Sequence, residues 1–246
     1  MSYSTAELMA IVLARTLGEG DVVLTGTNAA IPTAAYRTAQ RLGVDGLVAV
    51  NGALGTVDPS AAVVPDSSAD EDLLTGRFSI GLPEILRGEV RGLFDVVFLG
   101  AMQIDRHGQL NLVCVGDYHH PTVRGPGTLG LSMVAVIDRT LIYLTRHDPR
   151  TFVEAVDFVS SRTLRDDGRG LGLIVTPLAV LGPTPARDRV DIVSVHPGVD
   201  PEFVAAQTGF ALDMAAATQT PEPTARELEA LRAVDSTGTL RAMSLP

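Results

Sequence analysis

The sequence predicts an α/β fold built on a mixed, mostly parallel sheet that helices cover. Short runs of continuous apolar residues alternate with helix-like segments through the first half of the chain, which is typical of parallel strands buried on both faces. The second half holds more strand-like runs than helices, so we expect extra strands and not a plain dinucleotide-binding fold. Proline and glycine are spread along the whole length without a linker-like segment, and we therefore expect one domain over residues 1–246.

The N-terminal part of the chain alternates helix, strand, helix and strand. Ser4 and Glu7 have the S-x-x-E spacing of a capping box, which predicts a helix that begins there and ends near the Gly-Glu-Gly segment 18–20. The elements expected next are a strand at 21–26, a helix at 31–43 with proline in its first turn and glycine at its end, and a strand at 46–50.

Residues 56–80 are acidic and rich in serine and proline, which predicts a long surface loop of the kind that is usually functional or mobile. A helix at 82–92 and a strand at 94–100 should follow it, and then a segment, 101–116, that turns at 106–108 and returns as a strand. The remaining expected elements are paired strands at 133–137 and 140–145, strands at 172–182 and 190–196, and helices at 200–209 and 224–234.

The composition excludes several chemistries. All 19 basic residues are arginines, so the chain has no Schiff-base lysine, no P-loop lysine and no lysine general base. A formal charge of −10 argues against nucleic-acid binding, although a few local arginines can still bind phosphates. No apolar run reaches the roughly 18 residues that a membrane span needs, and the N-terminus lacks the features of a signal peptide. Cys114 is the only cysteine, which favours a cytoplasmic protein without disulfides.

Most of the polar candidates have a structural interpretation beside a chemical one. The adjacent histidines 119 and 120 cannot point the same way in an extended segment, so a solvated pair is favoured over a base or a metal site. His147 and His196 flank strands; His196 could present its imidazole at a strand end, but a histidine bonded to nearby backbone is the favoured interpretation. Cys114 lies among apolar residues and is expected in the core. No Cys/His spacing matches a zinc site, and no G-x-S-x-G motif is present.

Two features could stabilise a developing oxyanion. Gln103 follows a predicted strand end, where its amide N–H would either face an oxyanion or cap a turn, and Asn111 is a second amide of interest. The segment 124–130, RGPGTLG, is either an anion-binding nest of backbone N–H groups or an ordinary tight turn.

Five motifs in order carry a resemblance to a known family. The chain resembles the β subunits of family I CoA-transferases, which include glutaconate and 3-oxoacid CoA-transferases. The resemblance extends from about residue 25 to residue 210. The motifs are GAMQIDRHGQLN (100–111), RGPGTLG (124–130), RHDPRTFVEAVDFVSS (146–161), LIVTPLAVLG (173–182) and VSVHPGVDPEFVAAQTGF (193–210).

The resemblance implies a CoA-transferase β-subunit fold and a heteromeric enzyme. It implies pairing with a homologous α subunit, often as an α2β2 assembly, with an acyl-CoA site at the interface of the two subunits. Coenzyme A would enter as part of the substrate, and no permanently bound cofactor is implied. Arg106, Arg124 and Arg146 are possible contacts for the CoA phosphates, although a solvated surface role is the default for each.

In the family's S-E-N-G motif, the glutamate attacks the thioester and forms an acyl–glutamyl anhydride. The matching segment here is AVNG, residues 49–52, so Val50 stands at the position of the lost nucleophile while Asn51 and Gly52 keep the turn. Gln103 matches the family's amide, and the loop around Gly127 matches the loop that supplies a backbone oxyanion donor. The residues expected at the substrate or CoA are Asn51, Gly52, Gly125 and Thr128.

The missing glutamate leaves three interpretations. In the first, the complex acts on an acyl-CoA with a carboxylate of the α subunit, as in relatives that hydrolyse a carbon–carbon bond of a cyclic CoA thioester during steroid-ring degradation. In the second, it is a true CoA-transferase whose nucleophile has moved to the partner or to Asp58, several residues past the strand end. In the third, the chain is a non-catalytic scaffold subunit.

Overall fold

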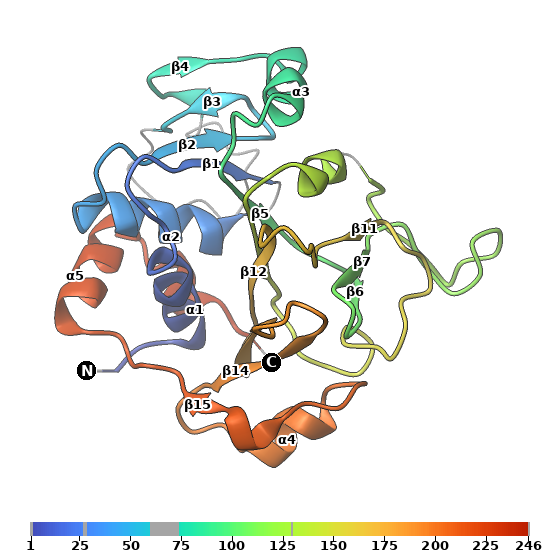
Figure 1. The fold of residues 1–246 in the computed structure, drawn as a ribbon. Coiled ribbons are helices and arrows are strands. Elements are labelled where there is room, and N and C mark those ends of the chain that lie inside the picture. Colours follow the sequence, from blue (N-terminus) through green and yellow to red (C-terminus); the bar gives the residue numbers. More distant parts are fainter. Residues whose placement is uncertain (1, 27–28, 60–73, 129, 246) are drawn as a thin grey trace. The chain divides into compact units, whose positions relative to one another are not determined.

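The computed structural model describes residues 2–26, 29–59, 74–128 and 130–245 (Figure 1). The chain divides into two compact units, which are described separately. The first unit comprises Met1–Leu99 and Glu222–Pro246, and the second comprises Gly100–Pro221. The expectation of a single domain over 1–246 stays a prediction.

The first unit is a sheet with helices beside it. Its elements are α1 (Thr5–Ala14), β1 (Val22–Thr25), α2 (Ala30–Arg41), β2 (Val48–Asn51), β3 (Thr56–Val57), β4 (Phe78–Ser79), α3 (Leu82–Val90), β5 (Val96–Leu99), α5 (Ala225–Val234) and α6 (Thr239–Ala242). The strand order is β5-β1-β2-β3-β4, in which β1 pairs in parallel with β2 and β5, and β3 pairs antiparallel with β2 and β4. Helices α1, α2 and α5 pack against one another (Figure 1).

The N-terminal helix confirms the predicted capping box. The Glu7 backbone N–H donates to Ser4 Oγ at 3.2 Å, and the Ser4 N–H donates to Glu7 Oε2 at 2.8 Å. Helix α1 is buried along its length from its second residue, which is why its sequence is apolar on every face. It ends at Ala14, earlier than predicted, and the backbone N–H of Gly18 bonds to Asp21 Oδ2 at 2.7 Å in the turn that leads into β1.

The second unit holds a five-stranded mixed sheet and two small antiparallel sheets. Its elements are β6 (Gln103–Ile104), β7 (Gln109–Asn111), β8 (Cys114–Val115), β9 (Val123–Arg124), η2 (Leu131–Ala135), β10 (Arg139–Tyr143), β11 (Ser161–Arg162), β12 (Gly170–Val175), β13 (Ala179–Pro183), β14 (Val190–Val195), α4 (Pro201–Ala206), η3 (Met214–Ala216) and β15 (Thr218–Gln219). The larger sheet has the order β15-β14-β13-β12-β10, with parallel outer pairs and antiparallel inner pairs.

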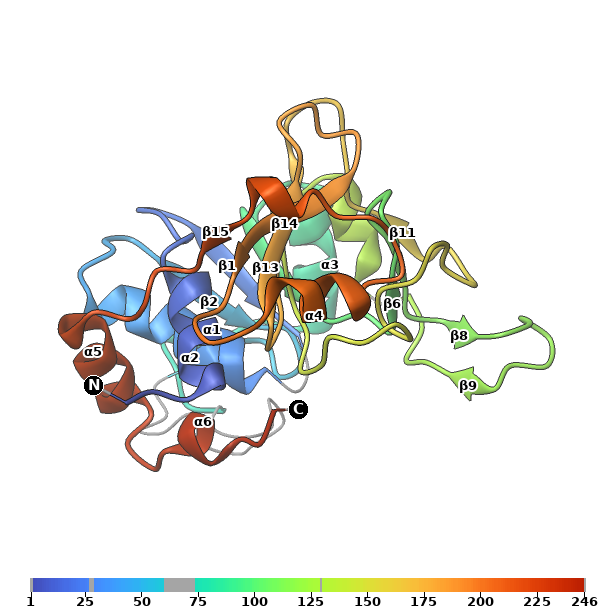
Figure 2. The same cartoon turned by 90° about the horizontal axis from the view of Figure 1, so that it is seen from below.

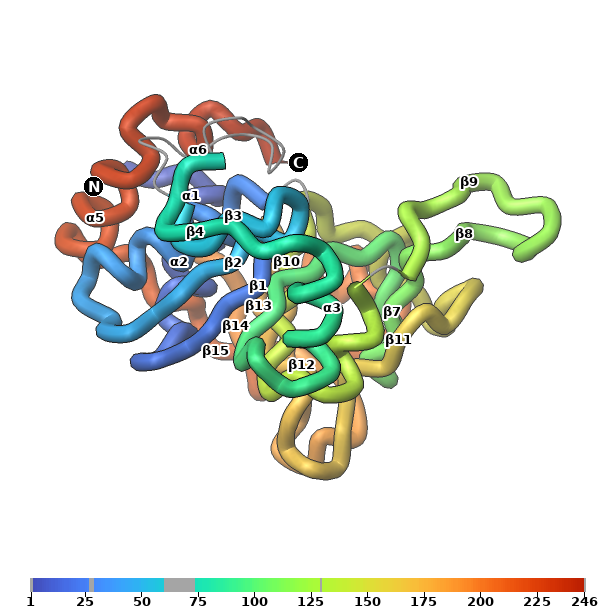
Figure 3. Tube along the Cα trace, turned by 90° about the horizontal axis from the view of Figure 1, so that it is seen from above, coloured from blue at the N-terminus to red at the C-terminus, as the bar shows by residue number. Residues whose placement is uncertain are grey.

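The small sheets of the second unit carry the segments of functional interest. Strands β6 and β7 form the predicted hairpin, and β11 pairs with β7. Strands β8 and β9 form a second hairpin, which extends away from the β6–β7–β11 sheet (Figure 2, Figure 3). The predicted mixed sheet with covering helices is confirmed.

Two local predictions were wrong. The run 133–137 is not a strand, because most of it belongs to the short 3-10 helix η2, where Met133 and Val134 are buried. An apolar run of this length has no periodicity that separates a strand from a buried helical turn. The predicted loop at 56–80 has short strands, β3 and β4, near its two ends, and Arg77 N–H bonds to Val57 O at 2.9 Å. Residues 60–73 lie outside the described residues. Within the described ranges, no helix is both long and apolar enough to cross a membrane.

Candidate active site

Val50 lies in the middle of paired strands and is buried. It is aligned with Leu24 of β1 on one side and with Val57 of β3 on the other, and only 4% of its surface is exposed. An isopropyl group there can neither attack a carbonyl nor carry charge. The environment of Val50 in this chain is therefore an apolar packing site, in which a carboxylate would lose much of its hydration.

Asn51 and Gly52 form the turn that follows β2. Asn51 is 3% exposed, and its Oδ1 accepts hydrogen bonds from Ala53 N at 2.9 Å and Leu54 N at 3.1 Å. Gly52 N–H donates to Thr25 O at 2.8 Å, and a Cβ on Gly52 would lie 2.7 Å from the same oxygen. Both residues thus have a structural role in the turn, and their contact with a substrate stays a prediction.

Asp58 is engaged by groups of its own unit. Its Oδ1 accepts a hydrogen bond from Ala49 N at 2.8 Å, and its Oδ2 pairs with Arg77 at 3.1 Å. Its backbone has the positive φ of 45° that non-glycine residues rarely adopt. A carboxylate used in this way to fix the edge of β2 is a poor candidate for a relocated nucleophile.

Gln103 is 4% exposed, and its amide is fixed in one orientation. Its Oε1 accepts hydrogen bonds from Asn111 Nδ2 at 2.6 Å and Asp157 N at 3.0 Å, and its Nε2 donates to Asp157 Oδ2 at 3.0 Å. An amide nitrogen carries two hydrogens. Among the residues that the structure describes, only one of them has a protein acceptor, and the second N–H has none.

Asn111 connects Gln103 to the segment that follows. It is fully buried, and its Oδ1 accepts hydrogen bonds from Val113 N at 3.0 Å and Cys114 N at 3.2 Å. Its Nδ2 donates both to Gln103 and to Cys114 O, the latter at 2.6 Å. The Cys114 thiol is buried, as predicted for a core residue.

The glycine loop runs directly along this segment. Gly125 N–H donates to Val113 O at 2.8 Å, and Gly127 N–H donates to Leu112 O at 2.9 Å. A Cβ on Gly125 would lie 2.2 Å from Leu112 O, so only glycine allows this approach. Because the Gly127 N–H is already used inside the loop, its role as an oxyanion donor stays a prediction, as does the ligand contact of the exposed Thr128.

In the second unit, Gln103 bonds to Asn111, while Gly125 and Gly127 bond to the backbone of the two residues that follow Asn111; we call these four residues the Gln103 network. Asp157 also bonds to Gln103 and was missed from the sequence, although it lies inside the motif 146–161. Val50, Asn51 and Gly52 form a separate group in the first unit, which we call the Val50 turn.

The two buried histidines are hydrogen-bonded within the protein, but of the predicted backbone contacts only the one from His196 to Thr176 O is present. His147 bonds to Thr176 Oγ1 at 2.9 Å and Thr208 Oγ1 at 3.0 Å, and His196 bonds to Thr220 Oγ1 and Thr176 O, both at 2.9 Å. Burial lowers the pKa of each imidazole to about 4, so both are neutral near pH 7. The histidines 119 and 120 are exposed in the β8–β9 hairpin, and the described residues contain no group of three or more His, Cys, Asp or Glu side chains that could hold a metal ion.

The arginines suggested as phosphate contacts are solvent-accessible. Arg124 lies over the Tyr118 ring, 5.2 Å from its centroid, and donates to the Tyr118 carbonyl at 3.0 Å. Arg146 is exposed and Arg106 is half-buried. Their contacts with CoA stay predictions.

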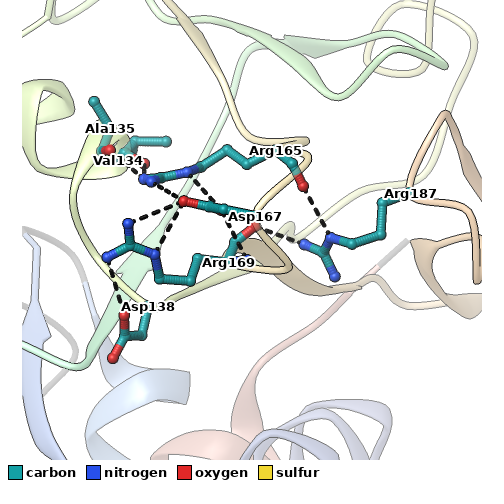
Figure 4. A network of polar contacts seen from close by, with 7 residues as sticks. All are labelled: Val134, Ala135, Asp138, Arg165, Asp167, Arg169 and Arg187. Atoms are coloured by element: carbon teal, nitrogen blue, oxygen red, sulfur yellow. Dashed lines mark hydrogen bonds and ion pairs between the residues drawn. The ribbon is translucent and has the colours of Figure 1, made fainter.

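A separate arginine cluster fixes the helix that follows the glycine loop (Figure 4). Arg165 donates to the carbonyls of Val134 and Ala135 in η2 and pairs with Asp167, which also bonds to Arg169. The hydrogen bond from Arg165 holds the pKa of the Asp167 carboxyl well below its usual range. These guanidinium groups are occupied by carbonyls and carboxylates, so the cluster is a structural support.

Comparison with known proteins defines the class of protein to which this fold and these motifs belong. The family model for coenzyme A transferase matches residues 6–207. The β subunit of 3-oxoadipate CoA-transferase from Pseudomonas knackmussii is 33% identical over 96% of this chain and 94% of the relative. The chain belongs to the coenzyme A transferase family and is similar to its β subunits.

Other relatives carry out different reactions. The cholesterol ring-cleaving hydrolase IpdB subunit from Rhodococcus jostii is 32% identical over 61% of this chain and 66% of the relative. The crystal structure of the decarboxylase AibA/AibB matches with a TM-score of 0.89 and 27% identity, and the match covers 100% of both chains. Membership of the family therefore leaves the type of reaction open.

Proposed function

We propose that this chain is the β subunit of a heteromeric enzyme that acts on an acyl-CoA thioester with a catalytic carboxylate of a homologous α subunit. The reaction is hydrolysis or carbon–carbon cleavage and does not pass through an acyl anhydride on this chain. The observation that carries the proposal is the buried, apolar environment of Val50, where transferase relatives are expected to carry glutamate. The names of the IpdB and AibA/AibB relatives support it, because they describe reactions other than CoA transfer.

In this proposal, the chain contributes oxyanion stabilisation. When a nucleophile or base acts on a thioester, negative charge develops on the carbonyl oxygen, and a fixed N–H donor at that oxygen lowers the barrier. The Gln103 side chain offers one such N–H on a rigid support. Gly127 is proposed as a second oxyanion-stabilising residue, and Asn51, Gly52, Gly125 and Thr128 are proposed as substrate or CoA contacts.

The proposed assembly is an α2β2 heterotetramer in the cytoplasm. Relatives such as AibA/AibB are named as two-subunit proteins, which supports a partner of the same kind. Coenzyme A enters as part of the substrate, with no permanently bound cofactor.

True CoA transfer is the second candidate, because the transferase relative is 33% identical along nearly the whole chain. It would require a nucleophile from the partner, since the Asp58 carboxylate already holds Ala49 N and Arg77. A scaffold subunit without any catalytic contribution is the third, and the free N–H of Gln103 argues against it.

The test is to express the chain together with an α-like subunit from the same genome and to incubate the purified complex with a panel of CoA esters. Mass spectrometry then follows the acyl group and CoA. We expect CoA to be released, or to stay attached to a cleaved or shortened acid, in the absence of an acceptor acid. CoA that moves only to an added carboxylic acid would contradict the proposal and support the transferase. An α subunit that is fully active alone would support the scaffold.

A further inference from the structure

Asp157 makes two hydrogen bonds with Gln103 and one with Gly116, and yet it is exposed. Its Oδ2 accepts from Gln103 Nε2 at 3.0 Å and from Gly116 N at 2.8 Å, while its own backbone N–H donates to Gln103 Oε1 at 3.0 Å. Carboxyl oxygen Oδ1 has no partner among the described side chains and backbone groups. The carboxylate thus lies between a buried amide and solvent.

Asp157 bonds to both polar atoms of the Gln103 amide: its backbone N–H donates to Oε1, and its carboxylate accepts from Nε2. If the Gln103 amide turned over, its Nε2 would face two N–H donors, from Asp157 and Asn111, and its Oε1 would face a carboxylate. At both ends of the flipped amide, hydrogen bonds would be lost and groups with like partial charges would face each other. Asp157 therefore fixes the plane of the amide and with it the direction of the second Nε2 hydrogen.

The segment that carries Asp157 also supports the loops beside Gln103. Gly116, at the base of the β8–β9 hairpin, is held by the carboxylate, and the neighbouring Phe158 stacks on Tyr118 of that hairpin with ring centroids 5.5 Å apart. Ser160 Oγ accepts a hydrogen bond from Leu112 N at 2.9 Å. Residues 157–160 thus form a continuous support for the segment 111–116 on which the glycine loop rests.

We infer that Asp157 is a positioning residue that aims the free N–H of Gln103 at the thioester oxygen of the substrate; this rests on the function proposed above. The role depends on an acceptor oxygen and not on negative charge. A charge beside a developing oxyanion would repel it, whereas the carbonyl of an asparagine would accept the same two hydrogen bonds.

Variants of Asp157 can separate the role of its acceptor oxygen from the role of its negative charge. Asp157→Asn keeps an acceptor for Gln103 and Gly116 and can place its NH₂ group where Oδ1 now faces solvent. Asp157→Ala removes the acceptor. Glu154→Ala is the matched control, because Glu154 is an exposed carboxylate of the same motif with no side-chain hydrogen bond among the described residues.

With the reconstituted complex and a CoA ester that the wild type turns over, Asp157→Ala should lower kcat by about 30-fold with little change in KM, because a misdirected donor acts mainly in the transition state. Asp157→Asn should recover most of that loss, and Glu154→Ala should match the wild type. In Gln103→Ala, the added Asp157→Ala change should have almost no further effect, because the amide to be aimed is gone.

Three results would overturn the inference. The first is an unchanged kcat in Asp157→Ala, and the second is additive losses of kcat in the double variant. The third is an equal loss of kcat in Asp157→Asn and Asp157→Ala, which would make the carboxylate itself the reacting group. A complex that turns over no CoA ester would instead refute the proposed function. In that case, NMR of the Gln103 side-chain NH₂ group still tests the positioning. Slow exchange of one Nε2 hydrogen should persist in Asp157→Asn and disappear in Asp157→Ala, and its persistence in both would contradict the inference.

Discussion

The Val50 turn and the Gln103 network both carry predicted site residues, and they differ in the chemistry of their side chains. The Val50 turn has an apolar, buried side chain at the position proposed for a nucleophile, and Asn51 and Gly52 form the turn. The Gln103 network has polar side chains, and each is bonded to at least one other member. A turn that is stabilised by its own backbone and by Asn51 does not depend on the side chain at position 50. The side chain at position 50 can therefore differ without a change in these turn contacts.

The largest expected effect is a loss of stability in acid. It sets the lowest pH at which the two regions can be compared in the folded chain. The buried His147 and His196 have a pKa of about 4 in the folded chain, against an ordinary value of 6.5. The unfolded chain therefore binds more protons between these values, so the free energy of unfolding falls as the pH drops from about 6.5 to about 4 and is fully retained above that window. We expect a loss of about 3 kcal/mol per histidine at about pH 4.

Urea unfolding at a series of pH values measures this loss. His147→Gln should unfold with a weaker pH dependence than the wild type, and His119→Gln, at an exposed position, should not differ from it. Parallel pH curves for His147→Gln and the wild type would show that the acid sensitivity comes from other groups.

Gln103→Ala tests the Gln103 network. Loss of a donor to the developing oxyanion should lower kcat by about 100-fold or more in the complex. Steady-state kinetics on the CoA ester found by the product analysis measure it, with circular dichroism to show that the variant is folded. A rate within about twofold of the wild type would remove Gln103 from the mechanism.

Val50→Glu tests whether position 50 in the Val50 turn can hold a carboxylate. Burial should raise the pKa of the new carboxyl group, so the variant should be less stable than the neutral Val50→Gln. Because burial penalises only the ionised carboxyl group, the two variants should have similar free energies of unfolding at low pH. The difference between them should grow as the pH rises above about 4.3, to about 2 kcal/mol near pH 7. Equal stability of the two variants at pH 7 would mean that position 50 is solvated, contrary to its 4% exposure.

The smallest effect concerns the turn itself. Asn51→Ala removes the acceptor for Ala53 N and Leu54 N and should cost about 1 kcal/mol in the free energy of unfolding. Asn51→Asp keeps an acceptor oxygen and should lose less, which chemical denaturation can measure. If the order of these two variants were reversed, another group would be holding the turn.

Much of the fold could be predicted from the sequence because its signals are local. The Ser4–Glu7 capping box lies within one helical turn, and the strands at 21–26 and 46–50 are short apolar runs with turn residues beside them. The run 133–137 was misassigned because the same apolar pattern suits a strand and a buried 3-10 turn.

The candidate site was predictable only in part. Gln103 and the glycine loop could be found from motifs, whereas the bond between Gln103 and Asp157 joins residues 54 positions apart. Nothing in the local spacing of Asp157 distinguishes it from any other acidic residue. The free N–H of Gln103 and the occupied N–H of Gly127 likewise depend on tertiary contacts.

The central claim is that no carboxylate of this chain forms a covalent bond with the substrate. The most direct measurement is peptide mass spectrometry of both subunits after the working complex has been treated with an acyl-CoA and then with hydroxylamine or borohydride, which trap acyl and CoA adducts of carboxylates. We expect no aspartate or glutamate of this chain to be modified. A hydroxamate or a reduced carboxyl group on this chain, at Asp58 or Asp157 for example, would contradict it.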